Sequence, residues 1–256
     1  MATERAETSE DAVLGGRLVL RQPRNGHRVG HDAILLAAVT SVRAGEQVVD
    51  LGAGVGAAGL AVARRIGGVA VTLVEIDPAL AALAGENAAR NALAERVRAV
   101  CLDVAAPSAA FAAAGLAPGA ADRVLMNPPF NAPQQQPSRD PSRRQAHSAS
   151  RHTLDRWLGA VARLLRPGGV VTLIWRADAL DSLLTALTAG FGAVTLLPIH
   201  PKPGASAIRV LARAVKASRA PLSLLPGFIL ADQVGKPTAQ AEAVLRGGGL
   251  LPLARD

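Results

Sequence analysis

Cysteine, lysine and long hydrophobic segments are scarce in this 256-residue chain, and the scarcity of cysteine and of long hydrophobic segments each excludes a class of protein. The single cysteine, Cys101, excludes an internal disulfide framework and leaves too few thiols for a zinc site built on cysteine. No apolar run approaches the roughly 18 residues that a membrane-spanning helix needs. The first residues are polar and carry Glu4, Glu7 and Glu10, unlike a signal peptide or a basic targeting helix. We expect a globular, cytoplasmic protein with no membrane partner and no metal, in which Cys101 is a buried strand residue.

Apolar residues and arginine are abundant instead. Hydrophobic residues make up 50% of the sequence, which is enough for a substantial core. The net charge of +8 and the isoelectric point of about 11.2 permit a polyanionic partner. The only lysines are Lys202, Lys216 and Lys236, and this bias toward arginine is also compatible with compositional drift. Charge alone therefore does not identify the partner.

From residue 47 onward, strand-like apolar runs alternate with segments of helical periodicity. The predicted strands are 48–51, 69–75, 97–102, 121–126 and 170–175, and the predicted helices are 56–66, 78–93, 108–115, 154–165 and 179–189. This alternation implies a parallel sheet covered on both faces. Two later strands, 193–199 and 207–214, are joined by a turn-rich segment without room for a helix, so we expect them to be antiparallel. The predicted fold class is α/β, with a Rossmann-like seven-stranded sheet that is mostly parallel and ends in an antiparallel C-terminal hairpin.

The first 45 residues show weaker patterns. We expect a disordered tail over 1–12, a short strand or hairpin arm over 15–22, and a helix that begins near His31 with Asp32 as its cap. The absence of a domain-sized linker predicts one domain over 13–256. Within it we distinguish an N-terminal extension (13–45), a core (46–216) and a C-terminal extension (217–256).

Polar and glycine residues follow three of the predicted strands. The segment from Asp50 through Gly52 and Gly54 ends the first strand and begins a helix, and glycines at such a turn let a ligand approach backbone N–H groups. Glu75 ends the second strand, where a carboxylate can accept hydrogen bonds from ribose hydroxyls. Asp103 follows the third strand and could meet the amine of an adenine; alone, it could equally be a helix cap or a solvated turn residue. Together these residues predict a nucleoside cofactor at the carboxyl edge of the sheet.

The fourth strand is followed by Asn127, Pro128, Pro129 and Phe130. The Asn127 side chain and the Pro128 carbonyl, held in direction by the next proline, can both accept hydrogen bonds from one NH2 group. Phe130 offers a face for a flat heterocycle. A proline-terminated strand end is the alternative for such a motif alone. In this context, we interpret the four residues as a catalytic site for a planar amine.

A polar, basic segment over 131–152 follows at once. We expect it to form a long loop, and loops of this length in compact α/β domains are usually functional or disordered. Arg139, Arg143 and Arg144 are its candidate substrate-binding residues. A solvated loop without a binding role is the alternative.

These motifs resemble those of class I S-adenosylmethionine-dependent methyltransferases, over about residues 26–214. The resemblance implies that S-adenosylmethionine is the cofactor, that Asp50, Gly52 and Gly54 hold its methionine portion, that Glu75 holds ribose and that Asp103 holds adenine. The N-P-P-[FY] group of that class methylates nitrogen on planar amino or amide groups. Asn127 would accordingly lie beside both the methyl donor and the target amine.

Within that group, residues 28–37 resemble the corresponding segment of the tRNA1(Val) adenine-N6 methyltransferases, so Gly30 and Asp32 join the expected cofactor-binding residues. The resemblance implies an N6-adenine methyltransferase whose partner is RNA, most simply tRNA. His31 in place of threonine and Phe130 in place of tyrosine depart from the pattern, and Phe130 keeps rRNA guanine-N2 methyltransferases as an alternative. Protein glutamine methyltransferases usually have a separate helical domain, for which the 49 residues before Asp50 leave little room. A non-catalytic RNA-binding module would have no reason to keep the intact motif, and no oligomeric state is predicted.

Overall fold

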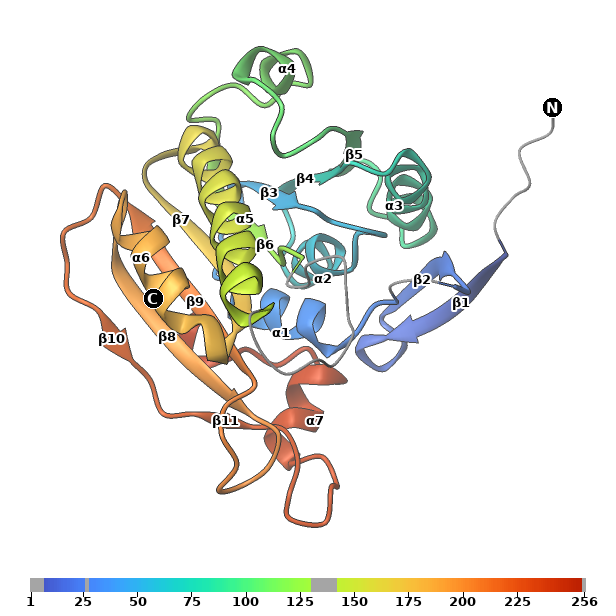
Figure 1. Ribbon diagram of the computed structural model, residues 1–256. Helices are drawn as coiled ribbons and strands as arrows, with labels where there is room; N and C mark the ends of the chain where they lie inside the picture. Colours follow the sequence, from blue (N-terminus) through green and yellow to red (C-terminus); the bar gives the residue numbers. More distant parts are fainter. Residues whose placement is uncertain (1–6, 26–27, 130–141, 255–256) are drawn as a thin grey trace.

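The structure is a computed structural model that describes residues 7–25, 28–129 and 142–254, with side chains described outside 142–151. A central sheet carries helices on both faces (Figure 1). Its strands are β3 (Gln47–Leu51), β4 (Ala70–Glu75), β5 (Val97–Cys101), β6 (Ala121–Met126), β7 (Leu165–Arg176), β8 (Phe191–His200), β9 (Arg209–Lys216), β10 (Ser223–Leu224) and β11 (Phe228–Ile229). Within the described ranges, no helix is long and apolar enough to cross a membrane.

The strand order is β10-β8-β9-β7-β6-β3-β4-β5, with β11 also paired to β8. Strands β3 to β7 pair in parallel, whereas β9 is antiparallel to both β7 and β8. The predicted mostly parallel sheet with an antiparallel C-terminal hairpin is therefore confirmed. The described sheet has nine strands rather than seven, because β10 and β11 add two residues each beside β8. Such short strands are too brief to show an alternating pattern.

The helices divide between the two faces of the sheet. They are α1 (His31–Val39), α2 (Ala57–Arg65), α3 (Pro78–Arg90), α4 (Ser108–Ala113), α5 (Ser142–Leu164), α6 (Leu180–Thr188) and α7 (Ala239–Leu245), with short 3-10 turns η1 (Leu14–Gly16), η2 (Ala177–Ala179) and η3 (Pro252–Ala254). One hydrophobic cluster joins α4, α5 and α6 to the sheet, and a second joins α1, α2 and α3 to it. A third encloses α1 between β7 to β9 and α7.

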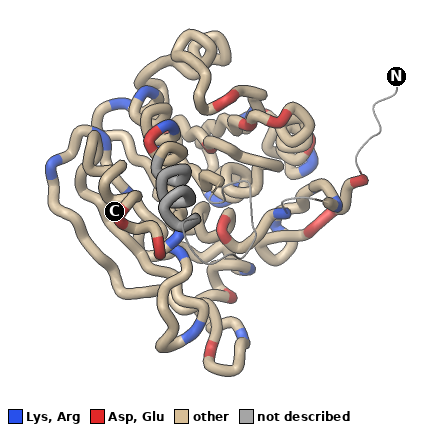
Figure 2. The backbone as a smooth tube through the Cα atoms, in the orientation of Figure 1, with Lys and Arg blue, Asp and Glu red and all other residues tan. Residues whose placement is uncertain are grey.

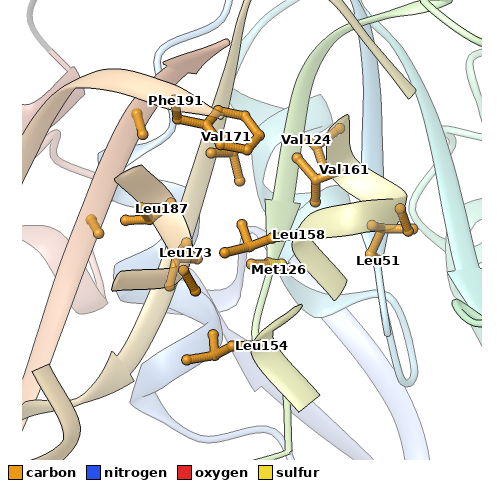
Figure 3. Packing of buried hydrophobic residues seen from close by; sticks show 14 of the residues in the cluster. Leu51, Val124, Met126, Leu154, Leu158, Val161, Val171, Leu173, Leu187 and Phe191 are labelled. Atoms are coloured by element: carbon orange, nitrogen blue, oxygen red, sulfur yellow. The ribbon is translucent and has the colours of Figure 1, made fainter. Parts of the chain in front are cut away.

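Helix α5 provides the centre of the first cluster. Leu154, Leu158 and Val161 recur at helical spacing and are nearly inaccessible to solvent. They pack beside Met126 and Leu173 of the strands beneath, as Figure 3 shows. Burying a leucine of this kind contributes roughly 1.5 to 3 kcal/mol. This packing fixes α5 across β6 and β7, directly beside the carboxyl end of β3.

The N-terminal prediction is wrong for residues 8–12. Residues Thr8–Val13 form β1, which pairs antiparallel with β2 (Leu18–Pro23). Two asparagines hold the free edge of β2: Asn87 of α3 bonds both the N–H and the C=O of Arg21, and Asn91, the C-cap of α3, does the same for Val19. The sequence of residues 8–12 is polar and does not by itself predict a strand. These residues are ordered by pairing with β2, which the two asparagines hold from far along the chain.

Two further expectations need correction. The segment predicted as a loop over 131–152 is helical from Ser142, so its second half is the beginning of α5. Cys101 does lie in a strand, but it is exposed, because β5 is the edge strand of the described sheet and pairs with β4 on one side only. A strand pattern in the sequence does not show which strand becomes an edge.

Candidate methyl-transfer site

Four neighbouring strands bring the predicted site residues to one edge. The order β6-β3-β4-β5 is parallel throughout, so the carboxyl ends of these strands meet. Gly52, Glu75, Asp103 and Asn127 stand at or just after those ends. Open α/β sheets bind ligands at this edge. The structure thus places the four strand-end positions as the sequence predicts, while their individual roles stay predictions.

The glycine turn between β3 and α2 is fixed by the neighbouring strand. The N–H groups of Gly52 and Ala53 donate to the carbonyl of Val74 at 2.8 and 3.0 Å. Gly52 and Gly54 have φ of +69° and +55°, a left-handed conformation that glycine adopts without strain. The space beside Gly54 is open, so a ligand can approach the backbone there, which is what a nucleoside cofactor requires.

The Glu75 carboxylate lies beside that turn and is only 8% exposed. It accepts hydrogen bonds from the N–H of Gly54 at 2.8 Å and from the N–H of Asp77 at 3.0 Å. Each carboxylate oxygen has a second acceptor direction, so ribose hydroxyls can still be bound. Glu75 therefore both shapes the glycine turn and remains able to hold a ribose.

Asp50 lies deeper than expected of a residue that touches a ligand. It is 2% exposed, and its Oδ2 accepts a hydrogen bond from the N–H of Gly59 in α2 at 2.8 Å. Burial raises the pKa of Asp50 to about 7, and the nearby Glu75 carboxylate adds to the increase, whereas the bond from Gly59 opposes it. The geometry shows Asp50 tying β3 to α2 beneath the turn, and its contact with a methionine portion stays a prediction.

Asp103 is exposed after β5 and accepts a hydrogen bond from the N–H of Ala105 at 2.8 Å. It therefore makes the local turn that we considered as an alternative, at a position that still faces the ligand-binding edge. Leu102 beside it is partly buried against the first hydrophobic cluster. An apolar wall and a carboxylate at this position suit an adenine ring and its amine.

Trp157 of α5 is a site residue that the sequence analysis missed. A methyl group added to Gly52 would lie 2.3 Å from the Trp157 ring, so the indole rests against the glycine turn. Trp157 also packs on the same cluster as Leu102. Tryptophan is a large apolar wall for a flat ligand. Nothing in the local sequence connects residue 157 with residue 52, since the contact depends on where α5 crosses the sheet.

The Asn127 amide follows β6, with Pro128 buried and Pro129 exposed after it. Its Oδ1 atom is buried and has no hydrogen-bond partner among the described residues. A buried acceptor without a donor costs about 1 to 3 kcal/mol, so such an atom indicates a missing partner. Phe130 and Arg139 lie outside the described residues. Arg143 and Arg144 fall in the first turn of α5, and their role in substrate binding stays a prediction.

The start of α1 approaches the same edge from the side. Gly30 is the N-cap of this helix and Asp32 lies in its first turn, so the expectation that Asp32 is the cap is wrong. Asp32 instead accepts a hydrogen bond at 3.1 Å from Arg209, which pairs with Arg176 at the carboxyl end of β7. The ion pair positions α1 beside the site. The cofactor-binding roles of Gly30 and Asp32 stay predictions.

The sheet order, the glycine turn and the acidic strand end are those of a class I methyltransferase fold, which binds a nucleoside cofactor at this edge. The chain belongs to the methyltransferase small domain family, which matches residues 28–202, and its cofactor is S-adenosylmethionine. The positive-φ glycines, the Glu75 carboxylate and the apolar wall at Leu102 fit that molecule. These residues would hold its amino-acid, ribose and adenine parts.

Named relatives agree with this family. A tRNA1(Val) (adenine(37)-N6)-methyltransferase of Bacteroides thetaiotaomicron is 30% identical over 186 residues, covering 72% of this chain and 75% of that protein. A protein of the same name from Bacteroides fragilis is 30% identical over 185 residues, with the same two shares. Among solved structures, a predicted O-methyltransferase from Agrobacterium tumefaciens superposes with a TM-score of 0.72 at 28% identity, covering 86% of this chain and 98% of that one.

Proposed function

We propose that this protein methylates the exocyclic N6 amine of an adenine in cytoplasmic tRNA. The observation that carries the proposal is the buried Oδ1 of Asn127, which lacks a donor among the described residues and stands beside the cofactor turn. An exocyclic amine can donate a hydrogen bond to this oxygen through one of its N–H groups. Two relatives that are 30% identical to this chain are named as methyltransferases of adenine N6 in a tRNA, which supports the same assignment here.

The geometry suggests how the residues act on the amine. An aromatic amine is a weak nucleophile because its lone pair is delocalised into the ring. Asn127 Oδ1 and the Pro128 carbonyl can each accept a hydrogen bond from one of the two N–H groups of the amine. These two bonds favour a tetrahedral nitrogen and direct its lone pair toward the methyl donor. S-adenosylmethionine, when bound, would supply an electrophilic methyl group: the N–C bond would form as the S–C bond breaks, S-adenosylhomocysteine would leave, and the amine would lose one proton to solvent. Orientation and fixed dipoles then provide the rate acceleration.

The test of this mechanism is the Asn127→Ala variant. A positioning hydrogen bond at the reacting centre is worth on the order of 10²- to 10³-fold in rate, by analogy with oxyanion-hole donors. We expect that loss in single-turnover methylation of purified tRNA, while calorimetric titration shows cofactor affinity near that of the wild type. Asn127→Asp is the matched control, because it keeps the acceptor oxygen and should retain more of the rate. Wild-type turnover by Asn127→Ala would exclude the mechanism.

The identity of the methylated atom has a separate test. Nucleosides from total tRNA and rRNA, prepared with and without the gene, can be compared by mass spectrometry. Loss of N6-methyladenosine from tRNA is the expected result. Loss of N2-methylguanosine from rRNA would assign the alternative base, and loss of a ribose 2′-O-methyl group would show that oxygen is the acceptor instead.

A further inference from the structure

A hollow of about 360 Å³ lies away from the glycine turn. Its walls come from η1, α1, α2 and the turn after α7, and α1 lies between α2 and α7 in Figure 1. Helix α2 begins beside the glycine turn, whereas Arg64 and Arg65, which line the hollow, stand at its far end, about 10 Å or more along the helix. The volume is in the range of small-ligand pockets, which begins at roughly 300 Å³.

Two kinds of side chain line this hollow. Small and branched apolar residues form its floor: Leu14, Ile34, Ala37, Ala38, Ala61 and Val244. Three arginines, Arg17, Arg64 and Arg65, supply its charge, and no acidic residue is among its lining. An apolar floor under a one-sided positive charge suits a ligand with a flat or hydrocarbon body and an anionic group.

Two of the arginines, Arg17 and Arg65, are held in place by backbone carbonyls and not by carboxylates. Arg17 donates to the carbonyl of Gly247 at 2.8 Å. Arg65 donates to Ala37 at 2.5 Å and also to Thr40, both near the end of α1. In the part of the chain that the structure describes, none of the three arginines forms an ion pair. Burial lowers the pKa of Arg65 to about 10, as expected for a guanidinium without a counter-ion.

We propose that this hollow, the Arg17–Arg64 pocket, binds one nucleotide, with the base on the apolar floor and the phosphate on the arginines. Guanidinium groups bind phosphate through paired N–H donors. Arg17 and Arg65 are already oriented by their carbonyl partners, which lowers the entropy cost of binding an anion. Such a nucleotide has two sources, a free nucleoside phosphate or a single-stranded part of an RNA.

The test uses the full chain and cytidine 5′-monophosphate, because a pyrimidine is a poor mimic of the adenosine in the cofactor. Saturable binding by calorimetry is expected, and it should persist with excess S-adenosylmethionine. Arg17→Ala and Arg64→Ala should each weaken it about tenfold or more, the value of one charge-assisted hydrogen bond. Both side chains are exposed, so circular dichroism should show folded variants.

Arg98→Ala is the matched control. Arg98 is also exposed and also donates to a backbone carbonyl at 2.8 Å, that of Ala114, but it lies outside the pocket. This variant changes the net charge equally and should bind cytidine monophosphate as the wild type does. Equal weakening in all three variants, or no saturable binding to the wild type, would overturn the proposal.

Three further ligands identify which chemistry is recognised. Cytidine without phosphate and inorganic phosphate alone should each bind more weakly than the nucleotide, and equal affinity for either one would contradict a nucleotide site. A short single-stranded oligoribonucleotide that displaces cytidine monophosphate would identify RNA as the source. Undisturbed nucleotide binding would identify a free nucleotide. The result does not depend on methylation, so failure of the proposed function would leave it standing.

Discussion

The buried carboxylate of Asp50 has two opposite effects on stability. Its burial costs free energy, whereas its hydrogen bond from Gly59 stabilises the connection between β3 and α2. Burial raises the pKa of Asp50 from 3.8 to about 7. Between these values, the folded state holds more protons than the unfolded chain, so this group lowers the free energy of unfolding as pH rises from about 4 to 7. The full penalty is present above pH 7 and amounts to at most ~4 kcal/mol.

The Asp50→Asn variant should therefore change the pH dependence of stability. An asparagine can still accept the hydrogen bond from Gly59 but has no charge to bury. The variant should gain stability relative to the wild type at pH 8 and lose that advantage toward pH 4, as measured by urea unfolding at several pH values. A constant difference across this range would show that Asp50 does not titrate as inferred.

The connection between α3 and the N-terminal hairpin also depends on one buried amide. Asn87 is fully buried, accepts from Arg21 N–H at 2.8 Å, and donates to the carbonyls of Arg21 and Val55 at 3.0 Å each. Val55 belongs to the glycine turn, so this side chain joins the hairpin to the cofactor site. Asn87→Ala would leave backbone groups without partners at a cost of about 2 to 4 kcal/mol.

Asn91→Ala is the comparison for that prediction. Asn91, the C-cap of α3, forms hydrogen bonds with the same strand, β2, but its side chain is partly exposed. Water can replace its bonds, so a smaller loss of stability is expected from thermal or denaturant unfolding. Asn87→Ala should also weaken cofactor binding through the turn. Equal losses of stability in the two variants would show that burial of Asn87 does not determine its contribution.

At the scale of elements, the sequence predicts what depends on local pattern. Strand β6 has the bounds that its apolar run indicates, and α3 begins at Pro78 after the cap Asp77. The sequence does not predict β1, whose polar residues are ordered by pairing with β2, or the beginning of α5, whose first turns are polar. Of the site, the strand ends were predictable, whereas the contact of Trp157 with Gly52 requires the packing of α5.

That contact gives a spectroscopic prediction. The chain has two tryptophans: Trp157 against the glycine turn, and Trp175, fully buried in β7. Binding of S-adenosylmethionine should change the emission of Trp157 alone. A fluorescence titration should show a saturable change in the wild type that Trp157→Phe abolishes and Trp175→Phe retains. If Trp157→Phe responds as strongly as the wild type, α5 does not form a wall of the cofactor site.

At the scale of the whole molecule, charge determines how RNA is approached. The net charge is +8, and Figure 2 shows basic positions spread over many elements. Long-range attraction is therefore expected from the entire surface, whereas close phosphate contacts should depend on position. The predicted contacts are Arg139, Arg143 and Arg144, which follow the Asn127 motif in the sequence.

Replacing Arg139, Arg143 and Arg144 by alanine should weaken RNA binding and reduce the salt slope of the logarithmic affinity by about 2 to 3, the value of three phosphate contacts. Cofactor affinity should not change. The control replaces Arg96, Arg98 and Arg219, which removes the same charge from positions flanking the amino ends of the parallel strands. It lowers the long-range attraction equally without removing contacts near the site. A smaller slope in the first variant alone would therefore show that the arginines after the motif bind phosphates, whereas matching slopes in the two variants would show that only net charge matters.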